Sequence, residues 1–142
     1  MYNIGWLYQN GLGVSQDYTE AMRWYRKAAD AGHAAAMRNI GWLYQNGLGV
    51  SQDYTEAMKW YRKAADAGHD AAMYNIGWLY QNGLGVSQDY TEAKKWYRKA
   101  ADAGNTFAAQ RLREPDRREN NGCGVGLIIL AFLGLVLVAC SR

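Results

Sequence analysis

Hydrophobic and polar positions follow one another along the chain with the spacing of an amphipathic helix. Over residues 34–45, one side of a helical wheel collects large apolar side chains, namely Met37, Ile40, Leu43 and Tyr44. The opposite side collects amides and one tryptophan, namely Asn39, Trp42, Gln45 and Asn46. The pair Asn46-Gly47 is typical of a helix C-terminus, so the pattern predicts a first helix that ends there.

A second helix is predicted from Asp53 to about Asp66, ending before Gly68. The Asp53 carboxylate suits the free backbone N–H groups at the start of this helix, and Glu56 completes a capping-box pattern. The inner face is expected to contain Ala57, Trp60, Tyr61 and Ala64. Charged residues at spacings of three and four form the outer face, which we interpret as a solvated surface: Glu56, Lys59, Arg62, Lys63 and Asp66.

The two-helix unit recurs three times. A block that begins Met-x-Asn-Ile-Gly-Trp-Leu-Tyr starts at Met1, Met37 and Met73, which sets the period at 36 residues. A period of this length indicates a helical unit stacked on itself, because one helix pair cannot bury its own apolar face. We therefore predict an all-α fold, an α-solenoid of three antiparallel helix pairs over residues 1–36, 37–72 and 73–108.

The columns shared by the three copies carry a family resemblance. In the second copy they read Ile40-Gly41-x-Leu43-Tyr44, Gly47-x-Gly49-Val50, Asp53, Ala57, Trp60-Tyr61-x-x-Ala64-Ala65 and Gly68. This pattern resembles the Sel-one-like repeat, a relative of the tetratricopeptide repeat with a slightly longer unit, and it covers residues 1–108. The resemblance implies a right-handed superhelix of antiparallel helix pairs that acts as an adaptor. It names no particular partner.

Charge is nearly balanced over the repeats. Residues 1–108 contain 11 basic and 10 acidic residues, and residues 109–142 contain 5 and 3. Such a balance gives no general attraction to nucleic acid, so we predict no nucleic-acid partner. Both cysteines, Cys123 and Cys140, lie near the C-terminus, so the repeats are expected to be held by packing alone.

The sequence does not indicate catalysis. The serines lack the Ser-x-x-Lys and Gly-x-Ser-x-Gly contexts of known nucleophiles, and the repeated Gly-Leu-Gly-Val lacks the lysine and preceding strand of a phosphate loop. His33 and His69 have no acidic or cysteine partner at matching spacing, so we predict no metal site. Asn105 replaces them before the final helix and is the better N-cap. We predict no enzymatic activity and no cofactor.

A column of tryptophans is the candidate binding feature of the repeats. Trp6, Trp42 and Trp78 recur opposite the first-helix core, beside Asn3, Asn39 and Asn75. Two interpretations are open: stacking buries the rings against the neighbouring first helix, or rings and amides line a concave groove that binds a protein or peptide. The residues beside this column differ between otherwise matching copies, so partner specificity is expected at Tyr2, Arg38 and Tyr74.

The C-terminal part is interpreted as a cap, a basic linker and an apolar tail. A partial capping helix is predicted over 109–116, its apolar positions taken by Phe107, Ala108 and Leu112 and its end marked by Pro115. Within 117–142, the uncharged run 123–140 is about 27 Å long as a helix, close to the ~30 Å of a bilayer core.

Four arginines precede this run: Arg111, Arg113, Arg117 and Arg118. We therefore predict a C-terminal hydrophobic helix that forms a single-pass membrane anchor, with the repeats in the cytoplasm. Acylation of Cys123 or Cys140 is an open alternative for additional anchoring.

The chain begins inside the repeat pattern, because Met1 stands in the column of Met37 and Met73. We expect either the end of a longer array or a late start codon, with an open first repeat that suits head-to-tail association between copies. Two functions follow as hypotheses. The first is a membrane-tethered adaptor that binds a protein or peptide in its groove, and the alternative is a self-assembling structural repeat protein without an external ligand.

Overall fold

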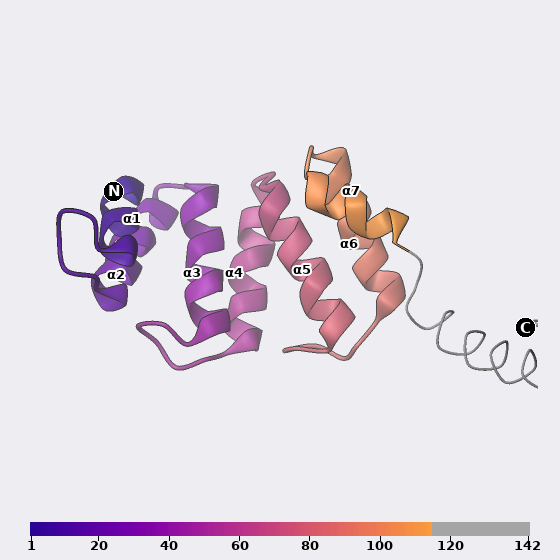
Figure 1. Ribbon diagram of the computed structural model, residues 1–142, viewed down its shortest axis with the longest axis horizontal. Coiled ribbons are helices and arrows are strands. Elements are labelled where there is room, and N and C mark those ends of the chain that lie inside the picture. The colour runs from indigo at the N-terminus through magenta and orange to yellow at the C-terminus, as the bar shows by residue number, and fades with distance from the viewer. Residues whose placement is uncertain (115–142) are drawn as a thin grey trace, which may run out of the picture. The chain divides into compact units, whose positions relative to one another are not determined.

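The structure, a computed structural model, describes residues 1–114 (Figure 1). These residues form helices and no strand, in the order α1 (Tyr2–Asn10), α2 (Tyr18–Asp30), α3 (Ala34–Asn46), α4 (Tyr54–Asp66), α5 (Asp70–Asn82), α6 (Tyr90–Asp102) and α7 (Thr106–Arg113). The compact unit Met1–Arg111 contains three stacked helix pairs, α1–α2, α3–α4 and α5–α6. The predicted all-α solenoid is confirmed.

Local sequence signals set the helix ends. Each first helix stops at a glycine in the left-handed conformation, and Gly47 does so with φ 63°. Each second helix starts at an aspartate whose carboxylate accepts from a backbone N–H, as Asp53 does from Glu56 at 3.0 Å. The capping box is only half made, because Glu56 pairs with Lys59 at 2.7 Å and the Asp53 N–H donates to Tyr44.

The buried core lies between helix pairs. One cluster joins α2 to α3, and it consists of Ala21, Met22, Tyr25, Ala28, Ala29, Ala36, Ile40 and Leu43. A second cluster joins α4 to α5 in the same columns, from Ala57 and Met58 to Ile76 and Leu79. The apolar surface of one pair is therefore removed from water by the next pair, as the repeat period predicts.

Within each pair, a first-helix glycine faces a second-helix tyrosine. A Cβ on Gly41 would lie 2.6 Å from the Tyr61 ring. A Cβ on Gly5 would likewise lie 2.7 Å from the Tyr25 ring, and one on Gly77 would lie 2.7 Å from the Tyr97 ring. The ring of Tyr61 is fully buried, and its hydroxyl donates to Gln45 at 2.7 Å. Hence the two helices are held at a distance that permits no side chain at the glycine position.

The turns between pairs contain histidine caps. The Nδ1 atoms of His33 and His69 accept from the N–H groups of Ala36 and Ala72, both at 3.3 Å. At the corresponding position before α7, Asn105 is buried and its Oδ1 accepts from Ala108 at the shorter distance of 2.9 Å. The sequence expectation that asparagine is the better cap for the last helix agrees with this geometry.

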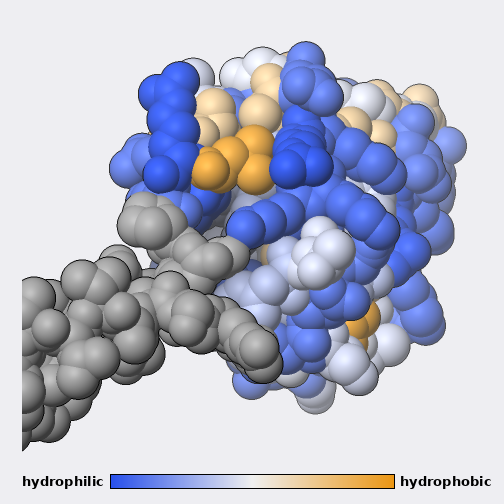
Figure 2. Space-filling view, turned by 90° about the vertical axis from the view of Figure 1, so that its right-hand side faces the viewer, coloured by the Kyte–Doolittle hydropathy of each residue, from blue (hydrophilic) through white to orange (hydrophobic). Residues whose placement is uncertain are grey.

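The last helix covers α6 incompletely. Ala108 is fully buried, whereas Phe107 is 68% exposed and contacts Tyr74 with ring centroids 6.4 Å apart. Phe107 thus differs from the buried apolar position expected from the sequence, because it occupies the column of the half-buried Ala35 and Ala71. From the side on which α6 and α7 lie in Figure 1, Figure 2 shows a mainly hydrophilic surface with small, separate hydrophobic areas.

Within residues 1–114, the helices lack the combination of length and apolar character that crossing a bilayer requires. The apolar run 123–140, and with it the predicted C-terminal hydrophobic helix, lies outside the described residues.

The His69 cap predicts a pH dependence of stability. Burial lowers the pKa of His69 below its usual 6.5; Asp70 opposes this change, and Arg38 and His33 add to it. With a lowered folded-state pKa, the stabilisation is complete above about pH 6.5 and is lost as the pH falls through that lowered pKa, where a protonated Nδ1 cannot accept. We expect His69→Asn to keep the cap and flatten this dependence, measured by urea unfolding from about pH 7 to pH 5.

The control is His69→Ala, which removes the cap and should cost about 0.5–1 kcal/mol at neutral pH. If the stability of wild type and His69→Asn falls in parallel with pH, the cap does not titrate as described.

Candidate partner-binding site

One of the columns that vary between copies forms a row along the first helices. Tyr2, Arg38 and Tyr74, here called the variable row, stand near the start of α1, α3 and α5, and each is partly exposed. The ring centroids of Tyr2 and Tyr25 are 5.7 Å apart, and those of Tyr74 and Tyr97 are 5.4 Å apart. The tyrosines buried within the pairs therefore support the row from beneath.

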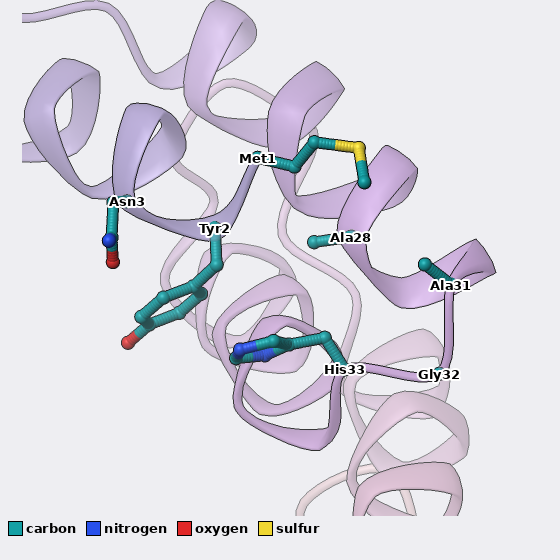
Figure 3. A pocket seen from close by; sticks show the side chains of 7 residues that line it. All are labelled: Met1, Tyr2, Asn3, Ala28, Ala31, Gly32 and His33. Carbon is teal, nitrogen blue, oxygen red and sulfur yellow. The ribbon is translucent and has the colours of Figure 1, made fainter.

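The row is also tied across the junction between pairs. The Tyr2 ring stacks on His33 at 4.6 Å with an angle of 16° between the planes, and the two rings lie side by side in Figure 3. Asn39 of the next pair donates its Nδ2 to the Tyr2 hydroxyl at 3.5 Å. An open hollow of about 470 Å³ lies beside these groups, lined by Met1, Tyr2, Asn3, Ala28, Ala31, Gly32 and His33.

The predicted asparagines are not equivalent. Asn3 is exposed and Asn75 is partly buried, but Asn39 is only 7% exposed. Asn39 hydrogen-bonds Tyr2 and also accepts from Arg38 at 3.3 Å. Its amide positions the row rather than facing solvent, because the preceding pair covers the side of the helix that the wheel placed opposite the core.

The predicted tryptophans likewise differ with their neighbours. Trp42 and Trp78 are partly buried and pack against the two core clusters, whereas Trp6 is 44% exposed. Leu7 shows the same contrast, with 37% exposure against complete burial of its counterpart Leu43. Stacking against the neighbouring helices accounts for the burial of Trp42 and Trp78, and Trp6 is the most exposed member of the column. The binding role of the tryptophans stays a prediction.

Burial and charge act together on the tyrosines beneath the row. Burial raises the pKa of Tyr25 to about 12, and the Asn39 amide and the charge of Arg38 oppose the rise. Burial also raises the pKa of Tyr61, against opposition from the charge of Arg38 and from the Asn75 amide. These hydroxyls therefore stay protonated near neutral pH and act as hydrogen-bonding groups only.

Sequence reasoning missed the part that His33 plays in this site. The histidines before α3 and α5 were its signal, since His33 caps α3 and its ring stacks on Tyr2, the first residue of α1. The site combines aromatic rings, hydroxyls, imidazoles and one guanidinium. In the described part of the chain, no three His, Cys, Asp or Glu side chains group closely enough to hold a metal ion. These groups are suited to recognition by ring contact and hydrogen bonding.

Comparison with known proteins agrees with this architecture. The Sel1 repeat family model matches residues 1–33, 34–69 and 70–105. A Sel1 repeat protein from Oxalobacter formigenes is 44% identical with a TM-score of 0.74, over 78% of this chain and 45% of that one. A protective antigen of uropathogenic Escherichia coli strains, which has an SLR fold, is also 44% identical with a TM-score of 0.74. The match covers 78% of this chain and 24% of the antigen.

Helicobacter pylori cysteine rich protein B is 26% identical with a TM-score of 0.65, over 69% of this chain and 74% of that one. Among curated proteins, none matches the sequence. The chain spans less than half of the two 44%-identical structures. The three matched repeats cover most of its length, and the helix pairs have the same arrangement as those of solved Sel1 repeat proteins. The chain therefore belongs to the Sel1 repeat family.

Proposed function

We propose that this Sel1 array is an adaptor that binds a protein or peptide across the variable row. One observation carries the proposal: first helices that are otherwise nearly identical differ at Tyr2, Arg38 and Tyr74, and these side chains are partly exposed on one row. Tyrosine and arginine are enriched among the residues that dominate binding energies, because they combine contact area with hydrogen bonding.

The framework beneath the row supports this role. Gly41 and Tyr61 fix the spacing of the helices, and Asn39 and His33 hold the Tyr2 ring in place. Side chains that are ordered before binding lose less conformational entropy when a partner docks. A partner lying along the first helices would meet all three pairs and the exposed Trp6 at one end.

A triple variant tests the row. Tyr2→Ala, Arg38→Ala and Tyr74→Ala together should weaken binding of peptides selected from a random display library by at least about tenfold, because the anchoring contacts are removed. The measurement is fluorescence anisotropy with the selected peptides.

The matched control is Arg23→Ala, Lys59→Ala and Lys95→Ala. These residues form exposed pairs with glutamates on the second helices, which contribute little to stability. If circular dichroism shows that both triple variants are folded and they bind the peptides equally well, the binding site does not include the variable row.

We further propose that residues 123–140 tether the array to a membrane. The support is the sequence alone, since this uncharged apolar run is long enough to span a bilayer and follows an arginine-rich segment. Leu130→Arg with Leu133→Arg should release the full chain from membranes into the alkaline carbonate wash, because each central arginine costs about 2.5–3.5 kcal/mol. Leu130→Ile with Leu133→Ile should stay bound, and release of wild type itself would rule out the tether.

Self-assembly is a second candidate function, favoured by the exposed surface of α1. The apolar columns that are buried in α3 and α5 are open there, with Ile4 36% and Leu7 37% exposed against 0% for Ile40 and Leu43. The same columns in the next pairs are covered by a preceding second helix, so the α1 surface is shaped for another helix of this kind.

Sedimentation of the full chain in detergent micelles tests self-assembly. The average mass of wild type should rise with concentration, and Leu7→Gln should abolish the rise because it places an amide in the apolar contact. Thr55→Gln, a change at an exposed position of α4, is the control and should behave like wild type. A wild-type mass that is independent of concentration would exclude this function.

A further inference from the structure

The middle of the variable row carries an isolated positive charge. Ten of the 11 basic residues in 1–108 lie on the second helices α2, α4 and α6, so Arg38 is the one basic residue of α1, α3 and α5. In the other two copies its column contains Tyr2 and Tyr74. The array thus presents one guanidinium between two phenol-bearing positions, on the face that the proposed function assigns to the partner.

The hydrogen-bonding capacity of Arg38 is largely unused. Among residues 1–114, no carboxylate pairs with it at salt-bridge distance, and its Nη1 donates to Asn39 at 3.3 Å. Its Nε is buried and lacks a partner among the same residues. A guanidinium has five N–H donors, and a buried donor without a partner costs about 1–3 kcal/mol. The Nη donors that remain unused belong to a partly exposed side chain, and a ligand can pair with those.

The charge of Arg38 acts on His69, whose pKa it helps to lower. The Nδ1 of His69 accepts from Ala72, so the neutral ring carries its proton on Nε2. Asp70, the acidic residue that acts on His69, accepts from Asn105 at 2.9 Å and is engaged there. The His69 Nε2–H is therefore a donor rather than an acceptor, and the Asp70 carboxylate beside that ring is already hydrogen-bonded.

The chemistry favours a carboxylate over phosphate groups. Recognition of phosphorylated peptides uses clusters of arginines, and nucleic acid requires an extended basic surface. Here there is a single guanidinium with aromatic rings on both sides along the row. Arginine pairs with a carboxylate through two parallel N–H···O bonds, which supply orientation as well as energy.

We propose that Arg38 binds the carboxylate of an acidic peptide whose flanking residues lie over Tyr2 and Tyr74. The inference rests on the proposed function, because it assigns the chemistry of the partner that the row binds. The carboxylate comes either from an aspartate or glutamate side chain or from the end of the peptide, and both sources present the same pair of oxygens to Arg38.

A display selection tests the inference. Short random peptides with no free C-terminus are selected against the full chain in detergent, against Arg38→Tyr and against Arg38→Glu. Tyrosine is tolerated at this column in the other two copies, so Arg38→Tyr should stay folded, which circular dichroism and urea unfolding verify. Wild type should enrich one aspartate or glutamate column, Arg38→Tyr should lose it, and Arg38→Glu should enrich lysine or arginine there.

Synthetic versions of the selected peptides separate the two carboxylate sources. Replacing the enriched glutamate by glutamine should weaken wild-type binding by about tenfold or more, the scale of one charge-assisted hydrogen bond, and should leave Arg38→Tyr unaffected. If side-chain recognition fails but free-acid peptides bind more tightly than amidated ones, and only with Arg38 present, the terminal carboxylate is the ligand and the inference stands.

The outcomes also separate this inference from the proposed function. If peptides are enriched by wild type without an acidic column or a preference for free acids, or if Arg38→Tyr keeps that preference, the carboxylate assignment is wrong while the adaptor function stands. If no protein enriches any peptide and free acids do not bind, both are overturned.

Discussion

The close approach of a first-helix glycine to a buried tyrosine is the constraint on which the array depends. At Gly41, any side chain would enter the Tyr61 ring, and the contact recurs at Gly5 and Gly77 with nearly the same geometry. Because the ring is buried and its hydroxyl is hydrogen-bonded to Gln45, neither partner has room to yield. The distance between the helices of each pair is therefore set once and repeated, which aligns the first helices and gives the variable row its regular spacing.

The stability of each helix pair depends on the pair packed against it. Each cluster takes one half from a second helix and the other half from the next first helix, so no pair has a complete core by itself. Met22 and Met58 are buried in these junctions, whereas α6, the last second helix, has an exposed lysine, Lys94, in their column. The side chain at that position is apolar where the next helix covers it and charged where it stays exposed.

The two kinds of helix divide the chemical groups between them. Second helices carry the exposed charges, with glutamate–lysine or glutamate–arginine pairs and lysines placed over Trp24, Trp60 and Trp96 at 4.3–4.5 Å. These contacts are nearly the same in all three pairs. First helices carry amides, aromatic rings and the single guanidinium of Arg38, and the copies differ there. The repeated charged pairs suit a solvated support, and the aromatic face with its varying column suits a recognition surface.

The sequence by itself determined the helices, their ends and their stacking. Asp53 caps its helix and Gly47 stops the preceding one through contacts within a few residues, and a period of 36 residues demands repeated junctions. Only the tertiary structure decided the state of each side chain at a junction. Trp6 and Trp42 have nearly the same local sequence and differ in burial, and Asn39 is covered although a wheel places it opposite the core. A helical wheel describes one helix, whereas burial depends on the helix packed against it.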